Sequence, residues 1–229
     1  MARLRNIWTM SLNPNPFRAV PVLAAAIMLA GCSSIGRGDI SSVYLIAKSV
    51  WGGSRQNVTL QEAASVPYAS MGVRLGDGEE TMIILAGDTG GQRLWTSSAR
   101  IALTTSDGRI VRTAGFEHNL GGYEPLGESP LDGGVHIVRW QADFPDLNLY
   151  SVPITCRDRQ AGNVTITILG TEVHTKRIEE TCASAGGRLD WSFKNTYWVD
   201  PDSGLIWRSI QLVHPQLDAI ESEILRPPA

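Results

Sequence analysis

The sequence lacks the features with which proteins bind nucleic acid or cross a membrane. Its basic residues are dispersed, and the longest basic run is the pair Lys176-Arg177. A nucleic-acid-binding protein needs a basic surface to displace counterions from the phosphates, so this class is excluded. The apolar stretch from Ala19 to Ala30 falls short of the roughly 20 residues that a transmembrane helix needs.

Residues that hold metals or perform catalysis are also sparse. The chain has 4 histidines and 3 cysteines, and neither a His-x-x-x-His nor a Cys-x-x-Cys spacing occurs. No metal site and no cofactor is therefore predicted. The Gly-x-Ser-x-Gly elbow of many hydrolases is missing too. The histidines, expected to form local hydrogen bonds on strands or at the surface, are His118, His136, His174 and His214.

What the sequence does contain is a composition typical of a globular protein, with 43% hydrophobic residues in a chain of 229. Basic residues without any acidic ones mark the N-terminus, at Arg3, Arg5 and Arg18. Residues 32–229 then hold 17 Lys and Arg against 23 Asp and Glu, a net charge of −6. A basic start, a short apolar stretch and the small pair Ala30-Gly31 are typical of a secretory signal peptide over residues 1–31.

The segment Leu29-Ala30-Gly31-Cys32 closely resembles the lipobox of bacterial lipoproteins. This resemblance implies that Cys32 receives a diacylglycerol and that the chain is cut before it and acylated at the new amine. One acyl chain anchors only marginally, whereas three make attachment to the membrane permanent. Ser33 stands where an aspartate would indicate inner-membrane retention in enterobacteria. The resemblance therefore implies the periplasmic face of the outer membrane. The alternative is a buried N-terminal helix with an incidental cysteine.

Once Cys32 is assigned to lipid, Cys156 and Cys182 remain as a pair. The periplasm is an oxidising compartment, so we expect a disulfide between them rather than two buried free thiols.

The rest of the chain is predicted to be a tether, residues 32–38, followed by a single β-rich domain, residues 39–229. One amphipathic helix is expected over 39–53, packed on the body of the protein rather than on the membrane surface. Beyond it, β-branched runs alternate with turn signals, which favours a two-sheet sandwich or an open barrel. Asp107-Gly108 predicts a tight hairpin turn, and residues 215–225 predict a short helix or an edge strand. Further strands are expected at 68–75, 81–86, 93–98, 135–142, 163–176, 189–199 and 205–213.

Three segments resemble the YjbF/GfcB family of lipoproteins, which is linked to exopolysaccharide and group-four capsule production. They are PYASMGVRLGDGEETMIILA, LWTSSARIALTTSDGRIVRTAGFEHNL and NTYWVDPDSGLIWRSIQLVHPQLDAIESEILRPP. The resemblance implies a β-rich lipoprotein of the outer membrane that takes part in making or exporting a surface polysaccharide. It implies no catalytic residue, and Cys32 is the functional residue that it carries over.

The tryptophans offer a second interpretation, because sugar rings stack on indoles. We expect most of them to fill the core, as large aromatic side chains do. Trp198 and Trp207 flank one turn and are the candidates for an exposed glycan-stacking pair. A glycan hydrolase would need two carboxylates, but the acids in predicted loops are too many to single out a pair: Asp88, Asp107, Glu117, Asp132, Asp200 and Asp202.

The sequence thus predicts a non-catalytic lipoprotein, held in the membrane by its N-terminal lipid, that assists polysaccharide assembly or export. Polysaccharide-export proteins, and the polysaccharide itself, are the expected partners. A glycan-binding module is the first alternative, and an enzyme that modifies the polymer is the second.

Overall fold

The computed structural model describes residues 57–132 and 135–228 of the chain. The predicted signal peptide, Cys32, the tether and the helix expected over residues 39–53 lie outside these described residues. Within the described part, no helix is long and apolar enough to span a membrane.

The described residues form one sheet of 12 antiparallel strands. Strands that are consecutive in the chain pair with each other, except β5 and β6, and the C-terminal strand β12 pairs with the first strand β1 and so joins the two halves. The sheet order therefore ends on two strands that are consecutive in the chain, β5 and β6. The elements are α2 (Leu60–Ser65), β1 (Ser70–Leu75), β2 (Thr81–Thr89), β3 (Gln92–Thr96), β4 (Ala102–Ser106), β5 (Arg109–Ala114), β6 (Gly122–Asp132), β7 (Val135–Phe144), the 3-10 turn η1 (Pro145–Leu147), β8 (Leu149–Ile168), β9 (Thr171–Ser184), β10 (Ser192–Val199), β11 (Ile206–Gln211) and β12 (Ile220–Arg226).

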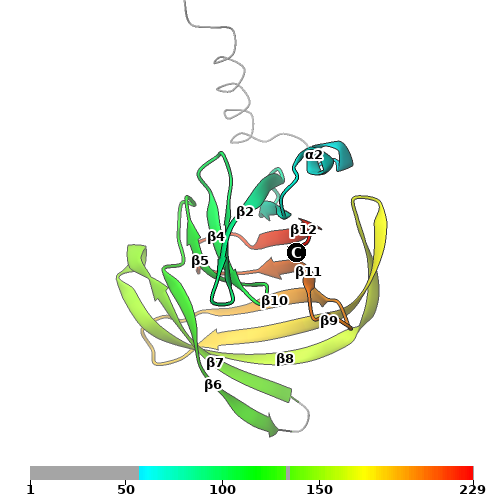
Figure 1. Ribbon diagram of the computed structural model, residues 1–229. Helices are drawn as coiled ribbons and strands as arrows, with labels where there is room; N and C mark the ends of the chain where they lie inside the picture. The colour runs from blue at the N-terminus through cyan, green and yellow to red at the C-terminus, as the bar shows by residue number, and fades with distance from the viewer. Residues whose placement is uncertain (1–56, 133–134, 229) are drawn as a thin grey trace, which may run out of the picture. The chain divides into compact units, whose positions relative to one another are not determined.

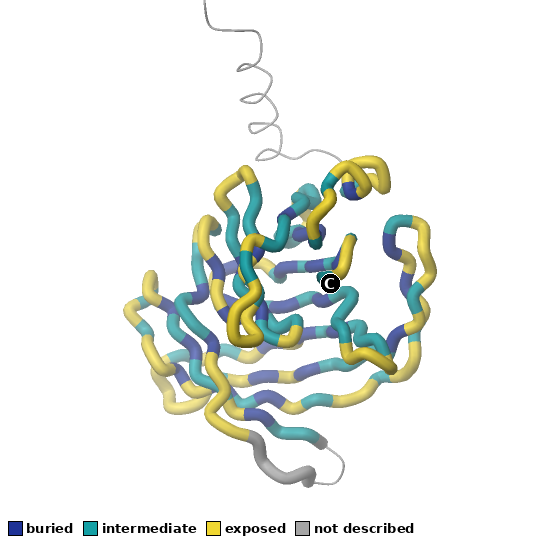
Figure 2. The backbone as a smooth tube through the Cα atoms, in the orientation of Figure 1, coloured by how far each residue is buried: buried dark blue, intermediate teal, exposed yellow. Residues whose placement is uncertain are grey.

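The sheet curls into a nearly closed barrel, which confirms the mostly-β prediction and selects the barrel from the two expected architectures (Figure 1). Buried and exposed residues alternate along the wall strands, as the period of two of a strand requires (Figure 2). On β8, for example, Val152, Ile154 and Cys156 are buried, and Ser151, Pro153 and Arg157 are exposed.

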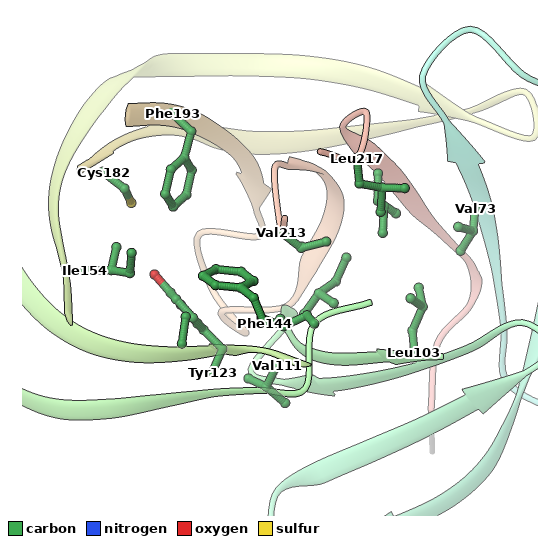
Figure 3. Close-up of a cluster of buried hydrophobic side chains, with 14 of the residues drawn as sticks. Val73, Leu103, Val111, Tyr123, Phe144, Ile154, Cys182, Phe193, Val213 and Leu217 are labelled. Atoms are coloured by element: carbon green, nitrogen blue, oxygen red, sulfur yellow. The ribbon is translucent and has the colours of Figure 1, made fainter. Parts of the chain in front are cut away.

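One end of the barrel is filled by apolar side chains. Phe144, Ile154, Cys182 and Phe193 project from four consecutive wall strands toward a common centre, where Tyr123 of β6 meets them (Figure 3). Phe144 and Ile154 are at most 1% exposed. Burial of a large apolar side chain contributes about 1.5–3 kcal/mol, so this end holds much of the stability of the fold.

The tight turn predicted at Asp107-Gly108 is present, with φ angles of 47° and 76°. A Cβ at Gly108 would come within 2.8 Å of Ile206 carbon atoms, so glycine lets the β4–β5 turn pack directly against the start of β11. The consecutive residues Ile110 and Val111 are both buried, which shows that both faces of β5 are covered. The β4–β5 hairpin therefore folds into the barrel.

The Gln211 side chain, at the end of β11, bonds to the free edge of β5. The Ile110 backbone N–H donates to Gln211 Oε1 at 3.0 Å, and Gln211 Nε2 donates to the Gly108 carbonyl at 3.0 Å. An unpaired strand edge normally exposes such groups to other chains. Near the start of β6, the Thr113 N–H donates to the Leu120 carbonyl at 3.0 Å. The barrel is thus closed by contacts across its interior as well as at the seam.

Two predicted elements differ from the structure. The tail forms neither a helix nor an edge strand, because β12 lies inside the sheet between β1 and β11. The strand expected over 163–176 is instead a hairpin whose turn is Leu169-Gly170, with φ angles of 47° and 83°. Leucine is a rare residue at positive φ, so the sequence carried no clear signal for this turn.

Candidate functional site

A cavity of about 460 Å³ lies at the end of the barrel opposite the apolar core. Its rim includes exposed residues at the β4–β5 turn and on β6, among them Asp107, Glu124 and Pro125. The apolar part of its wall consists of Val111, Val138, Ile178, Val199 and Ile206. The cavity therefore combines a wide apolar wall with a few polar groups, as small-molecule sites do.

Arg109 lines the floor of the cavity and belongs to a buried ion pair. Arg109 of β5 binds both carboxylate oxygens of Glu180 on β9, with its two terminal nitrogens at 2.5 and 3.0 Å. Glu180 is 0% exposed. Its Oε2 also accepts hydrogen bonds from Asn195 Nδ2 at 2.8 Å and from the Tyr197 hydroxyl at 3.2 Å. The charge of each partner is thus neutralised, which a buried ion pair requires.

Three aromatic rings surround the Arg109 guanidinium. Its central carbon lies 4.5 Å from the ring centre of Trp140, 5.4 Å from that of Tyr197 and 5.7 Å from that of Tyr123. Trp140 also stacks on Tyr123 at 4.8 Å. Burial raises the pKa of both tyrosines, so their hydroxyls stay neutral and act as hydrogen-bond donors. Cation–π contacts of this kind hold the arginine in one orientation.

Asp158 and His136 stand above this floor, directly opposite each other on β8 and β7. The His136 ring contacts Asp158 Oδ2 at 3.4 Å, and Asp158 is also opposite Glu180 in the β8–β9 ladder. Burial, followed by the negative charge of Glu180, raises the pKa of Asp158. Two buried polar atoms in this region have no hydrogen-bond partner among the described residues, namely Asp158 Oδ1 and Trp140 Nε1.

The two carboxylates inside the barrel differ in how far they can reach a ligand. Both oxygens of Glu180 are engaged by Arg109, Asn195 and Tyr197, so this carboxylate is not free to contact a ligand. Asp158, the other carboxylate inside the barrel at this level, lines the cavity and contacts the His136 ring.

The acids nominated from the sequence do not form a pair at the cavity. Among them Asp107 lines it, whereas Asp88 pairs with Arg93 at 2.9 Å and Asp200 accepts the backbone N–H groups of its own turn. Sequence reasoning missed Asp158 and Glu180. A signal was available in the cysteines. Asp158 follows Cys156 by two residues and Glu180 precedes Cys182 by two, and a disulfide between antiparallel strands fixes which residues are opposite each other.

A second hollow, of about 400 Å³, lies beside the start of α2 and is lined by glutamates. Glu62 closes a capping box with Thr59 at the helix N-terminus, and Glu80 accepts the Val58 N–H at 2.7 Å. These carboxylates satisfy local backbone donors, so the hollow is explained by the structure of the loop itself.

Two groups of residues in the described part of the chain have donor atoms close enough to share a metal ion. In the first, Cys156 and Cys182 form a disulfide and Glu180 is paired with Arg109, so no ligand is available.

The second group is His118, Asp146 and His214, which the sequence showed as distant residues. Asp146 binds His118 Nδ1 at 2.7 Å and His214 Nε2 at 3.1 Å. His214 Nδ1 accepts the Gln216 N–H at 3.1 Å, so the proton of the neutral ring is on Nε2 and no lone pair faces the other two residues. The group is therefore a hydrogen-bonded clasp of three loops at the apolar end of the barrel.

This clasp predicts a pH-dependent loss of stability. Burial lowers the pKa of His214, against the opposing effect of Asp146. In the unfolded chain this histidine binds a proton near pH 6.5, whereas in the folded chain it does so only at lower pH. The free energy of unfolding therefore falls as the pH falls below about 6.5. In urea titrations between pH 7.5 and 5, His214→Gln should flatten this decline, and His174→Gln, on an exposed strand position, should leave it unchanged. Equal slopes in both variants would contradict the assignment.

The predicted disulfide is present. Cys156 and Cys182 are bonded at 2.02 Å and are directly opposite in the β8–β9 ladder. They are at most 1% exposed. Cys32 lies outside the described residues, and its lipidation stays a prediction.

The tryptophans lie mostly in or against the core, as expected. Trp95 is 1% exposed, and Trp140, Trp191 and Trp207 pack against the buried cluster. Trp198 and Trp207 are not opposite each other. Trp198 pairs with Arg208, and Trp207 lies at the bulge between the pairs Trp198–Arg208 and Val199–Ile206. The Trp207 indole N–H faces Asp200 Oδ2 at 3.4 Å instead. A role of Trp198 and Trp207 in glycan stacking stays a prediction.

Comparisons with known proteins agree on one family. The model of the family described as "Group 4 capsule polysaccharide lipoprotein gfcB, YjbF" matches residues 45–225. The "Uncharacterized lipoprotein GfcB" of Escherichia coli K12 is 27% identical over 208 residues, which are 88% of this chain and 95% of that protein. The "Uncharacterized lipoprotein YjbF" of the same organism is 23% identical over 211 residues, which are 90% and 96% of the two chains.

A solved structure has the same fold. The crystal structure of the hypothetical lipoprotein YmcC from Escherichia coli K12 superposes with a TM-score of 0.61 at 24% identity. The match covers 83% of this chain and 96% of that one. At this identity the likeness concerns the fold.

Proposed function

The chain belongs to the family of group 4 capsule polysaccharide lipoproteins, and from this we propose that it is an outer-membrane lipoprotein that assists polysaccharide assembly or export without catalysing a reaction. Lipid on Cys32 holds the β-barrel at the periplasmic face of the membrane. There the barrel meets export proteins and the polymer. The observation that carries the proposal is the family match over residues 45–225, which joins a lipoprotein to a capsule polysaccharide.

The interior of the barrel supports a role without catalysis. Glu180, the fully buried carboxylate behind Arg109, is held in an ion pair and does not line the cavity. General acid–base or nucleophilic catalysis would have to come from Asp158 and His136, which already contact each other at 3.4 Å. The cavity itself favours the second candidate, a glycan-binding module, since it is large enough for a small ligand.

The tethering function is tested by removing the lipid attachment. In Cys32→Ala cells we expect the protein to lose palmitate labelling, to leave the outer-membrane fraction, and to reduce the amount of surface polysaccharide. The loss of the protein from the outer-membrane fraction should be nearly complete, because the acyl chains are its predicted anchor.

The matched control for this test is Ser34→Ala, which changes a neighbouring residue and should keep labelling, fractionation and polymer normal. Ser33→Asp tests the address separately, because it should move the labelled protein to the inner membrane. Normal fractionation and normal polymer in Cys32→Ala would refute the proposal.

A further inference from the structure

We propose that the cavity binds the neutral sugar unit at the end of a glycan chain, an inference that rests on the proposed role in polysaccharide production. The site consists of Arg109 at the floor, the side chains of Asp158, His136 and Trp140, and the apolar wall described above. We call this set of residues the cup.

The cup is closed at its lower end. Beyond Arg109 and Tyr123 the free space shrinks to about 10 Å³, which is roughly the room that one water molecule needs. Below that level Phe144, Phe193 and their neighbours fill the barrel (Figure 3). A polymer therefore cannot pass through the barrel along its axis, and a chain end or a short oligosaccharide is what the cup admits.

The volume and the charge of the cup limit the ligand further. About 460 Å³ lies within the roughly 300–1,000 Å³ of typical small-molecule sites, which suits a mono- or disaccharide. The charge of Arg109 is cancelled by Glu180, and the other carboxylates at the cup are Asp107, Glu124 and Asp158. A uronate or a phosphate would be repelled by these groups, so a neutral sugar is favoured.

The polar groups of the cup fit hydroxyl groups. The side chains of Asp158 and His136 line the cavity and stay 28% and 38% exposed, so the carboxylate can accept a hydrogen bond and the imidazole can donate or accept one. A sugar hydroxyl both donates and accepts, so a single ligand can bond to both side chains. The apolar side chains of the wall then contact the C–H faces of the ring.

Binding is measured on the full-length lipoprotein in detergent, by calorimetry and by tryptophan fluorescence. The probes are lactose, cellobiose, an acidic digalacturonate, and short fragments of the surface polysaccharide of the producing bacterium. We expect at least one neutral probe to bind and digalacturonate not to bind. Asp158→Asn should weaken binding about 10–100-fold because it removes the negative charge of the acceptor. Trp140→Phe should weaken binding about 2–10-fold because the smaller ring leaves part of the wall without contact to the ligand.

Glu172→Gln, an exposed carboxylate at the tip of the β8–β9 hairpin, is the matched control and should leave affinity unchanged. Val199→Phe narrows the cup without touching its polar groups, and it should weaken binding even if Asp158→Asn fails to fold. The inference is overturned if no neutral probe binds, if digalacturonate alone binds, or if the cup variants bind as the control does.

Competition by intact polymer tests whether the cup is closed at its lower end or is an open groove. At equal mass, long chains should compete far less well than short fragments, because they carry fewer ends. Competition that follows total sugar mass would overturn the assignment to chain ends. If the sugars do not bind but Cys32→Ala cells make less polymer, this inference alone is rejected. If the sugars bind but those cells make a normal amount of polymer, the tethering function alone is rejected.

Discussion

Replacing Glu180 with glutamine is expected to lower the free energy of unfolding by about 3–5 kcal/mol. The glutamine keeps the shape of the side chain but leaves the Arg109 guanidinium buried without its counter-charge. Arg109 has no other carboxylate bonded to it among the described residues, and the aromatic rings around it offset only part of the loss. Urea unfolding followed by circular dichroism measures the effect.

The next residue along β9 provides the control. Glu179 pairs with Arg159 at 2.5 Å and with Arg177 at 2.9 Å, but it lies on the outer face of the barrel. Exposed pairs contribute about 0–1 kcal/mol, so Glu179→Gln should cost less than about 1 kcal/mol. Combining Glu180→Gln with Arg109→Met removes both buried charges and should recover much of the stability. A cost for Glu180→Gln no greater than for Glu179→Gln would refute the importance of the pair.

The strands that could be predicted are those bounded by strong turn signals. Asp107-Gly108 has the residues that a tight hairpin turn requires, and its hairpin is present. Leu169-Gly170 forms an equally tight turn without an asparagine or aspartate, so the sequence predicts one strand where the structure has a hairpin. Local residue preferences decided both outcomes.

The closure of the barrel could not be predicted, since it depends on contacts between residues far apart in the chain. Gln211 bonds the backbone of β5 from more than 100 positions away, and Arg109 reaches Glu180 over 71 positions. Nothing in the neighbourhood of either residue marks it as a cross-barrel contact. The position of β12 inside the sheet, between β1 and β11, has the same origin.

The candidate site, too, was predictable where local signals decide and not where distant residues meet. The disulfide was predictable by counting cysteines, and with it the β8–β9 register places Asp158 opposite Glu180 on the face that carries the sulfurs. The partner of Glu180 was not predictable, because Arg109 lies on a strand of the other half of the sheet. The clasp of His118 and His214 was hidden for the same reason, since three separate loops bring it together.

Loss of the disulfide is expected to lower the free energy of unfolding by about 3–4 kcal/mol, on the chain-entropy model for cysteines 26 positions apart. The variant Cys156→Ala/Cys182→Ala should show this loss in urea at neutral pH. Each alanine also removes a buried sulfur next to the Tyr123 hydroxyl, which lies 3.5 Å from Cys156 Sγ. Reduced wild-type protein, which keeps the sulfurs, therefore separates the cross-link from the packing.

Burial also controls how the disulfide responds to reductant. Both sulfurs belong to residues that are at most 1% exposed, so a small thiol can reach them when the β8–β9 region opens. We expect native protein in dithiothreitol to be reduced no faster than this region opens, and sub-denaturing urea should accelerate the reduction. The alanine double variant, which has no disulfide to reduce, is the control for effects of reductant on the rest of the fold. Reduction of native protein at the rate of an exposed disulfide would show that β8 and β9 separate readily. The wall of the cup that these two strands form would then not be rigid.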